Sequence, residues 1–222
     1  MQAKGYAFSV IGGREMNQDS FLVNDAKHLY AIADGVGGGL SGDVASQMAV
    51  AGLDARFNDP GQRLTEIFFE LQKEVLGYSM TEYGDALMGT TLTAAAIRND
   101  SINVCHVGDS RCYHYTQSTL RLLTEDQEFY DEALKGSVLA SYLGIPNNTH
   151  PIRITEEAVA LTPGDRILIC SDGLYRQMTE PRMVTLIRTH LANPAELVEA
   201  LCTEASQKDP SDNVTVVYVE IE

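Results

Sequence analysis

The sequence predicts an α+β fold in a single domain, 1–222, in which blocks of strands alternate with two pairs of helices. Short apolar or alternating runs, bounded by Gly, Asn and Asp, recur along the chain and are typical of strands. Two longer segments, near 42–78 and 180–207, carry apolar residues at helical spacing. A length of 222 residues suits one domain with a large core, and two domains would be crowded.

The first half of the chain is expected to hold three strands and then two helices. The strands are predicted at 6–12, 21–24 and 28–33. One helix is expected from about Asp43 to Phe57, and a second from Pro60 to about Tyr78. Each helix has an apolar stripe, which predicts packing in the core rather than a binding surface.

The second half is expected to hold most of the strands and the second helix pair. Segment 127–151 has mixed polarity and is predicted to be a mobile excursion with one short helical piece. The remaining predicted elements are strands at 92–97, 102–107, 112–115, 120–123, 158–161 and 166–170, helices at 180–191 and 194–207, and a closing strand at 214–221.

Composition excludes several classes of function. Sixteen basic and thirty-one acidic side chains give a net charge of −15, which argues against binding nucleic acid or an anionic membrane surface. No apolar stretch is long enough to span a membrane, and no apolar region follows the N-terminus as in a secretory signal, so a cytoplasmic protein is expected. The four cysteines are far apart and are expected to be buried free thiols.

The most informative stretch is the apolar run 30–33, which ends at Asp34 and is followed by four glycines within five residues. A carboxylate is therefore expected where a buried strand ends and the backbone turns. Gly35 has no side chain, so its carbonyl could approach a bound ion closely. Taken alone, the stretch favours a tight turn that Asp34 caps over an ion site.

Similar acidic corners recur at Asp109, Asp172 and Asp212, each beside Gly or Asn at a strand end, while Asp19 lies in a loop between two strands. Several carboxylates that meet in one cleft would repel one another strongly. Mg²⁺ or Mn²⁺ would compensate that charge, because hard cations take oxygen ligands. The histidines show no spacing typical of zinc ligands.

Two arginines are close to these corners in sequence. Arg14 could form a structural ion pair, or its planar guanidinium could bind a phosphate through two hydrogen bonds. Arg111, which follows the corner at Asp109, is interpreted as a structural residue.

Six short motifs follow one another along the chain: Arg14-Glu-Met-Asn-Gln-Asp19, Asp34-Gly-Val-Gly-Gly38, Gly89-Thr-Thr91, Gly108-Asp-Ser-Arg111, Ser171-Asp-Gly-Leu174 and Asp212-Asn-Val-Thr215. No single motif would be specific. Their order and approximate spacing resemble those of the metal-dependent protein phosphatases, the protein phosphatase 2C family, in its compact bacterial branch, and the resemblance extends from about residue 5 to residue 221.

The resemblance implies a four-layer α/β/β/α sandwich of two antiparallel sheets flanked by helix pairs, with two Mn²⁺ or Mg²⁺ ions in a cleft at one end. Segment 127–151 would be the flap beside that cleft. The implied site residues are Asp34 bridging both metals, Gly35 through its carbonyl, Asp172 and Asp212 on the first metal, Asp109 with Asp172 on a third metal, Arg14 on the substrate phosphate, and Asp19, Gln18 and Asn213 around them.

Two positions depart from the family pattern. Gln18 stands where Glu is frequent, so the second metal would lose a charged contact. Val36 stands where some members carry a histidine proposed as general acid, so the leaving group would take its proton by another route, such as a metal-bound water.

The implied function is hydrolysis of phosphoserine and phosphothreonine in proteins by a monomeric cytoplasmic enzyme that opposes a Ser/Thr kinase. Attack by a water that bridges two cations would need no cysteine nucleophile. The main alternative is a non-catalytic regulatory or binding module of the same fold. A third possibility is a metal-dependent hydrolase of small phosphoesters or nucleic acid, although the acidic balance disfavours nucleic acid.

Overall fold

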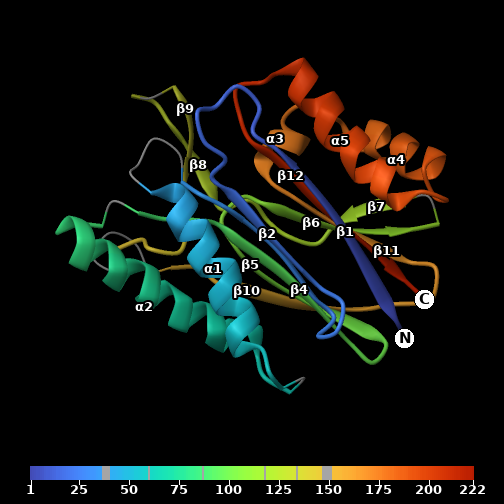
Figure 1. Cartoon of the computed structure of the whole chain (residues 1–222), viewed down its shortest axis with the longest axis horizontal. Coiled ribbons are helices and arrows are strands. Elements are labelled where there is room, and N and C mark those ends of the chain that lie inside the picture. Colours follow the sequence, from blue (N-terminus) through green and yellow to red (C-terminus); the bar gives the residue numbers. More distant parts are fainter. Residues whose placement is uncertain (37–40, 60, 87, 118, 134, 147–151) are drawn as a thin grey trace.

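The computed structural model describes residues 1–222 except 37–40, 60, 87, 118, 134 and 147–151. Figure 1 shows two sheets that face each other, with helices on the outer side of each. In the first sheet the strand order is β1-β12-β11-β6-β7, and neighbouring strands are antiparallel. These strands are β1 (Ala3–Val10), β12 (Val214–Ile221), β11 (Arg166–Cys170), β6 (Arg111–Thr116) and β7 (Thr119–Leu122).

The second sheet has the order β10-β5-β4-β3-β2 and is also antiparallel. Its strands are β10 (Thr155–Ala160), β5 (Ser101–Val107), β4 (Leu92–Arg98), β3 (Leu29–Asp34) and β2 (Asp19–Asn24). The helices are α1 (Gly42–Arg56), α2 (Leu64–Tyr83), α3 (Asp172–Tyr175), α4 (Glu180–Thr189) and α5 (Pro194–Lys208). None of the helices in the described ranges combines the length and hydropathy needed to cross a bilayer.

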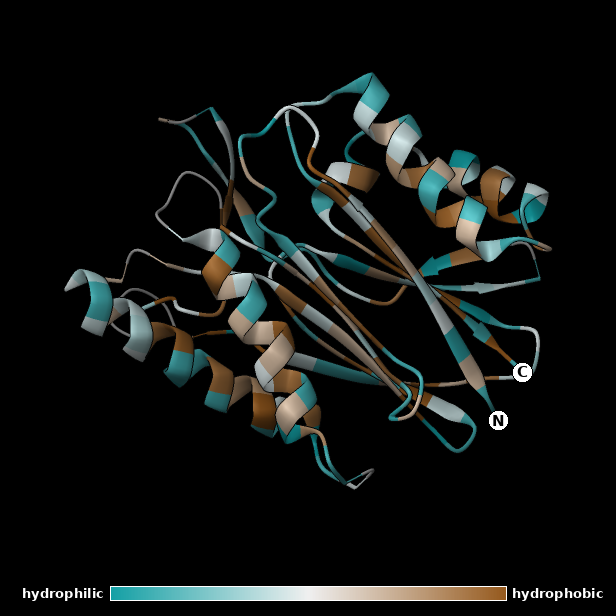
Figure 2. Cartoon of the chain, viewed as in Figure 1, coloured by the Kyte–Doolittle hydropathy of each residue, from teal (hydrophilic) through white to brown (hydrophobic). Residues whose placement is uncertain are grey.

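Three separate apolar clusters hold the layers together. One cluster lies between α1, α2 and the second sheet, another between the first sheet and helices α3 to α5, and the third between the two sheets. Strand β3 shows how alternation divides its side chains, since Ala31 packs toward the helices while Tyr30 and Ile32 pack between the sheets. Figure 2 shows the matching pattern on the helices, which are hydrophobic along part of their surface only. The four-layer sandwich is confirmed.

Several predicted boundaries were wrong. The second helix begins at Leu64 and continues to Tyr83, while Pro60, where it was expected to begin, lies outside the described residues. Asp19 is not in a loop but begins β2, where it pairs with Asp34. The short helix α3 was not predicted at all.

The segment 127–151 differs most from the prediction. In its described part there is no helix, and β8 (Glu128–Asp131) pairs with β9 (Gly136–Leu139) as a hairpin. The Asp131 carboxylate accepts a hydrogen bond from Ala133 N at 2.8 Å, and Lys135 has a φ of 51°. These local turn features end strand β8 within a segment for which the sequence predicted one short helical piece.

Candidate functional site

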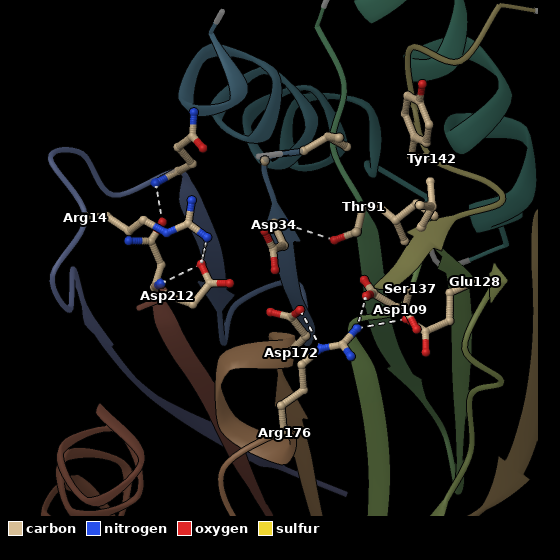
Figure 3. A pocket seen from close by; sticks show the side chains of 16 residues that line it. Arg14, Asp34, Thr91, Asp109, Glu128, Ser137, Tyr142, Asp172, Arg176 and Asp212 are labelled. Carbon is tan, nitrogen blue, oxygen red and sulfur yellow. Dashed lines mark hydrogen bonds and ion pairs between the residues drawn. The ribbon is translucent and has the colours of Figure 1, made fainter. Parts of the chain in front are cut away.

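A cavity of about 370 Å³ opens among the strand ends and the β8–β9 hairpin. Figure 3 shows acidic side chains from separate parts of the chain pointing toward it. Of the nine site residues expected from the sequence, all but Asp19 line it: Arg14, Gln18, Asp34, Gly35, Asp109, Asp172, Asp212 and Asn213. Residues 37–39, the remaining glycines of the Asp34 motif, lie outside the described residues.

Asp34 is fixed by its backbone at the last position of β3. Its N–H donates to Thr91 Oγ1 at 2.9 Å, and its carbonyl accepts a hydrogen bond from Thr91 N at 2.8 Å. Burial raises the pKa of its carboxyl well above the usual value, and repulsion from Asp19 and Asp172 adds to the shift. The Gly89-Thr-Thr91 motif therefore positions Asp34.

Gly35 lies where backbone segments meet. A Cβ at this position would be 2.4 Å from the carbonyl oxygen of Gly42, so any other residue would force the β3–α1 connection apart. Its N–H donates to Gln18 O at 3.1 Å. Close packing thus brings the Gly35 backbone to the cavity.

Asp19 lies behind the cavity wall. Its Oδ2 accepts hydrogen bonds from Ser171 Oγ at 2.8 Å and Thr215 Oγ1 at 2.6 Å. Its Oδ1 is buried and has no hydrogen-bond partner. Burial, with repulsion from Asp172 and Asp212, raises the pKa of Asp19 to about 6.

Asp109 and Asp172 share a partner that the sequence analysis missed. Arg176 Nε donates to Asp172 Oδ2 at 2.8 Å, and Arg176 Nη2 lies 3.2 Å from Asp109 Oδ2. Burial and repulsion from Asp172 raise the pKa of Asp109 to about 7. Burial also raises the pKa of Asp172, with a contribution from Asp212. The spacing of four residues between Asp172 and Arg176, one helical turn, was the available signal.

Asp212 is paired with Arg14, whose Nη2 lies 2.9 Å from Asp212 Oδ1. Both side chains are 41% exposed. Asn213 connects this corner to the N-terminal loop, because its Oδ1 accepts a hydrogen bond from Gln18 N at 2.9 Å. Its Nδ2 donates to Ile11 O at 2.8 Å. Asn213 thus joins two motifs that are far apart in the sequence.

Arg111 has the structural role that was predicted for it. Its guanidinium binds the Asp126 carboxylate through two nitrogens and stacks 3.6 Å from the centre of the Tyr175 ring. The four cysteines are confirmed as buried free thiols.

The donors around the cavity suit a hard divalent cation. They are carboxylate oxygens and the backbone of Gly35. In addition, the Oδ1 atom of Asp19 is buried and has no hydrogen-bond partner, as expected of an oxygen near a cation site. As the described side chains stand, however, no group of three acidic, histidine or cysteine residues converges on one point. Two of these carboxylates are paired with arginines, Asp212 with Arg14 and Asp172 with Arg176. Ion binding would therefore require both aspartates to turn away from their arginine partners.

Comparisons with known proteins show which family the chain resembles in sequence and in fold. The family model described as protein phosphatase 2C matches residues 9–203. The serine/threonine phosphatase stp of Listeria monocytogenes is 30% identical, and the alignment covers 93% of this chain and 91% of that protein. The crystal structure of the Mycobacterium tuberculosis serine/threonine phosphatase PstP/Ppp superposes with a TM-score of 0.88 at 28% identity, over all of both chains. A structure of the PstP catalytic domain with two manganese ions has a TM-score of 0.83 at 28% identity and covers 99% of this chain and 98% of that one.

Proposed function

This chain belongs to the protein phosphatase 2C family and is a metal-dependent serine/threonine phosphatase, and we propose that the carboxylate-lined cavity is its active site. The observation that carries the assignment is the meeting of carboxylates from positions 34, 109, 172 and 212 in one cavity. Mutual repulsion and burial make that arrangement unfavourable unless positive charge compensates it. Nothing in the structure or the comparisons favours a non-catalytic role.

The cofactor is a pair of Mn²⁺ or Mg²⁺ ions, in agreement with the manganese-bound relative. Asp34, the Gly35 carbonyl, Asp172 and Asp212 would hold the pair, and Asp109 with Asp172 would hold a third, weaker ion. Asp19, Gln18 and Asn213 would support them from behind. Bound divalent ions supply Lewis-acid chemistry, which polarises a phosphate ester and lowers the pKa of water toward about 7.

Arg14 is assigned to the substrate phosphate. Its guanidinium lines the cavity and remains 41% exposed, so an incoming dianion could reach it. A planar guanidinium matches phosphate oxygens with two parallel hydrogen bonds. Asp212 and the carbonyl of Ser211 hold the Arg14 side chain in place, with Nε 2.6 Å from the carbonyl oxygen.

No histidine lines the cavity in the described part of the chain, and Val36 occupies the position of a possible general acid. The proton for the departing serine or threonine oxygen would therefore come from water in the cavity. Substrates would approach past the β8–β9 hairpin, because Ser137, Val138 and Leu139 form part of the wall.

The substrates are phosphorylated proteins, and we assign their phosphorylation to a cognate Ser/Thr kinase. The chain is proposed to act as a single domain and a monomer in the cytoplasm. The three apolar clusters together draw side chains from both sheets and both helix pairs, which supports one domain.

Phosphate release from a phosphothreonine peptide tests the function. Protein stripped of metal with a chelator should be inactive and should recover on addition of Mn²⁺. Asp172→Asn should stay inactive at every Mn²⁺ concentration, because it removes a proposed ligand. The matched control is Asp100→Asn, an exposed carboxylate in the β4–β5 turn, which should keep wild-type turnover. Metal-independent turnover, or an active Asp172→Asn, would contradict the assignment.

A further inference from the structure

Arg176 connects the cavity to the hairpin that covers it. One guanidinium contacts carboxylates from three separate segments: Asp172 of α3, Asp109 after β5, and Glu128 of β8. The contact with Glu128 Oε2 is 2.8 Å and uses Nη2, the same nitrogen that lies 3.2 Å from Asp109. Figure 3 shows Arg176 between these side chains.

The same guanidinium stands where a divalent ion shared by Asp109 and Asp172 would need to bind. Two positive groups within a few ångströms repel each other, and their repulsion is strong in a partly buried cavity. The Asp109 and Asp172 side chains are only 8% and 19% exposed, so water would screen that repulsion poorly. Arg176 and such an ion therefore exclude each other.

The hairpin has a second anchor that does not involve the cavity. Asp126, next to the hairpin, is held by Arg111, and Gln127 N donates to Gly108 O at 2.9 Å. These contacts fix the base of the hairpin whether or not an ion is present. In the described part of the chain, the Arg176–Glu128 pair joins the hairpin to the cation that also contacts the cavity carboxylates.

We propose that Arg176 is a positioning residue that exchanges partners with the metal. Without an ion at Asp109 and Asp172, its charge neutralises both carboxylates and holds the β8–β9 hairpin through Glu128. When a divalent ion takes these two carboxylates, Arg176 turns away and the hairpin loses its tie to the cavity. This inference rests on the proposed function, because it assumes that Asp172 is a metal ligand.

Two measurements on initially metal-free protein test this change of partners. One is hydrogen exchange of the β8–β9 amides, and the other is Mn²⁺ binding by calorimetry. In the wild type, saturating Mn²⁺ should speed exchange in the hairpin. In Arg176→Gln, exchange should already be fast without metal and should not respond to Mn²⁺. The weakest Mn²⁺ site should bind about tenfold more tightly in this variant, because a positive charge has been removed beside it.

Glu128→Gln separates the contact of Arg176 with the hairpin from its competition with the metal ion. It should loosen the hairpin without tightening Mn²⁺ binding, because Arg176 stays on Asp109 and Asp172. The matched control is Arg182→Gln, which breaks an ion pair with Glu204 between α4 and α5 and should behave as wild type in both measurements.

A merely structural Arg176 would predict weaker Mn²⁺ binding in Arg176→Gln, and that result would overturn the proposal, as would hairpin exchange that does not differ from wild type. If the wild type binds no Mn²⁺, the proposed function fails, and the proposed change of Arg176 partners fails with it. If wild-type Mn²⁺ binding is normal and Arg176→Gln changes neither measurement, the proposed function stands and only the proposed change of Arg176 partners fails.

Discussion

Asp19 and Asp34 are direct partners in the antiparallel ladder between β2 and β3. Like charges opposite each other destabilise a sheet. Here both side chains are also half-buried, and the pKa of each carboxyl group is raised. The pairing weakens the fold in the absence of a cation, so it is best explained by a role in binding one.

The Asp34→Asn variant should therefore separate stability from function. At pH 8 and without metal, it should raise the free energy of unfolding by about 1 kcal/mol, because one of two opposed charges is gone. It should also lose Mn²⁺ binding and turnover, since an amide cannot replace the charge of the proposed carboxylate ligand. Urea unfolding with chelator present, together with calorimetry, provides both values.

The exposed Asp100→Asn serves again as the control and should change neither quantity. Were Asp34→Asn less stable than wild type without metal, the carboxylate would be part of the structural framework. Were it to bind Mn²⁺ normally, the ligand assignment would be wrong.

A variant of Arg14 should affect substrate binding while leaving metal binding largely unchanged. Arg14→Ala should raise KM for a phosphothreonine peptide by about tenfold to a hundredfold, the range expected for charge-assisted hydrogen bonds. The Mn²⁺ concentration for half-maximal activity should change much less. Steady-state kinetics at several Mn²⁺ concentrations distinguish these effects.

Arg121→Ala removes another surface arginine, which pairs with Glu157 on the second sheet, and it should leave KM unchanged. An unaltered KM in Arg14→Ala would assign Arg14 to holding Asp212 only.

Most of the fold was predictable because it depends on local patterns. Alternation of side chains in β3 and β12 separates helix-facing from sheet-facing residues. In the sequence, β3 is visible as a continuous apolar run and β12 as an alternating one. The β8–β9 hairpin was missed because segment 127–151 has mixed polarity, which predicted a mobile excursion with one short helical piece, whereas the Asp131 side chain stabilises a turn after β8. A side chain that bonds to its own backbone leaves no periodic signal.

The site was predictable only in part. The acidic corners stand beside glycine or asparagine and could be found one by one. The hydroxyl of Thr215 that holds Asp19 is separated from it by 196 positions, and no local pattern reports such a contact. Arg176 was missed for a similar reason, because its partner Glu128 comes from the hairpin.

Gly173 tests how closely the two acidic corners must approach. A Cβ there would lie 2.1 Å from the carbonyl oxygen of Asn213, so Gly173→Ala should push apart the turns that carry Asp172 and Asp212. We expect a loss of about 1–3 kcal/mol in stability, as for overpacked sites, and weaker Mn²⁺ binding. Gly77→Ala is the control, because nothing lies within 4 Å of a Cβ at this helical position. It should be neutral or stabilising. Normal Mn²⁺ affinity in Gly173→Ala would show that the corners act independently.

His106 should make the protein less stable in acid. It is 1% exposed, and burial lowers its pKa to about 4, against about 6.5 in an unfolded chain. Between pH 6.5 and 4, His106 is protonated in the unfolded chain but not in the folded protein. The free energy of unfolding therefore decreases over this range, by about 3 kcal/mol in total. In urea unfolding of metal-free protein, His106→Asn should lack this part of the pH dependence. Ile102→Val, an apolar change on the same strand, should shift stability equally at every pH. If His106→Asn and wild type differ by a constant amount across this range, His106 is protonated in the folded state and the argument fails.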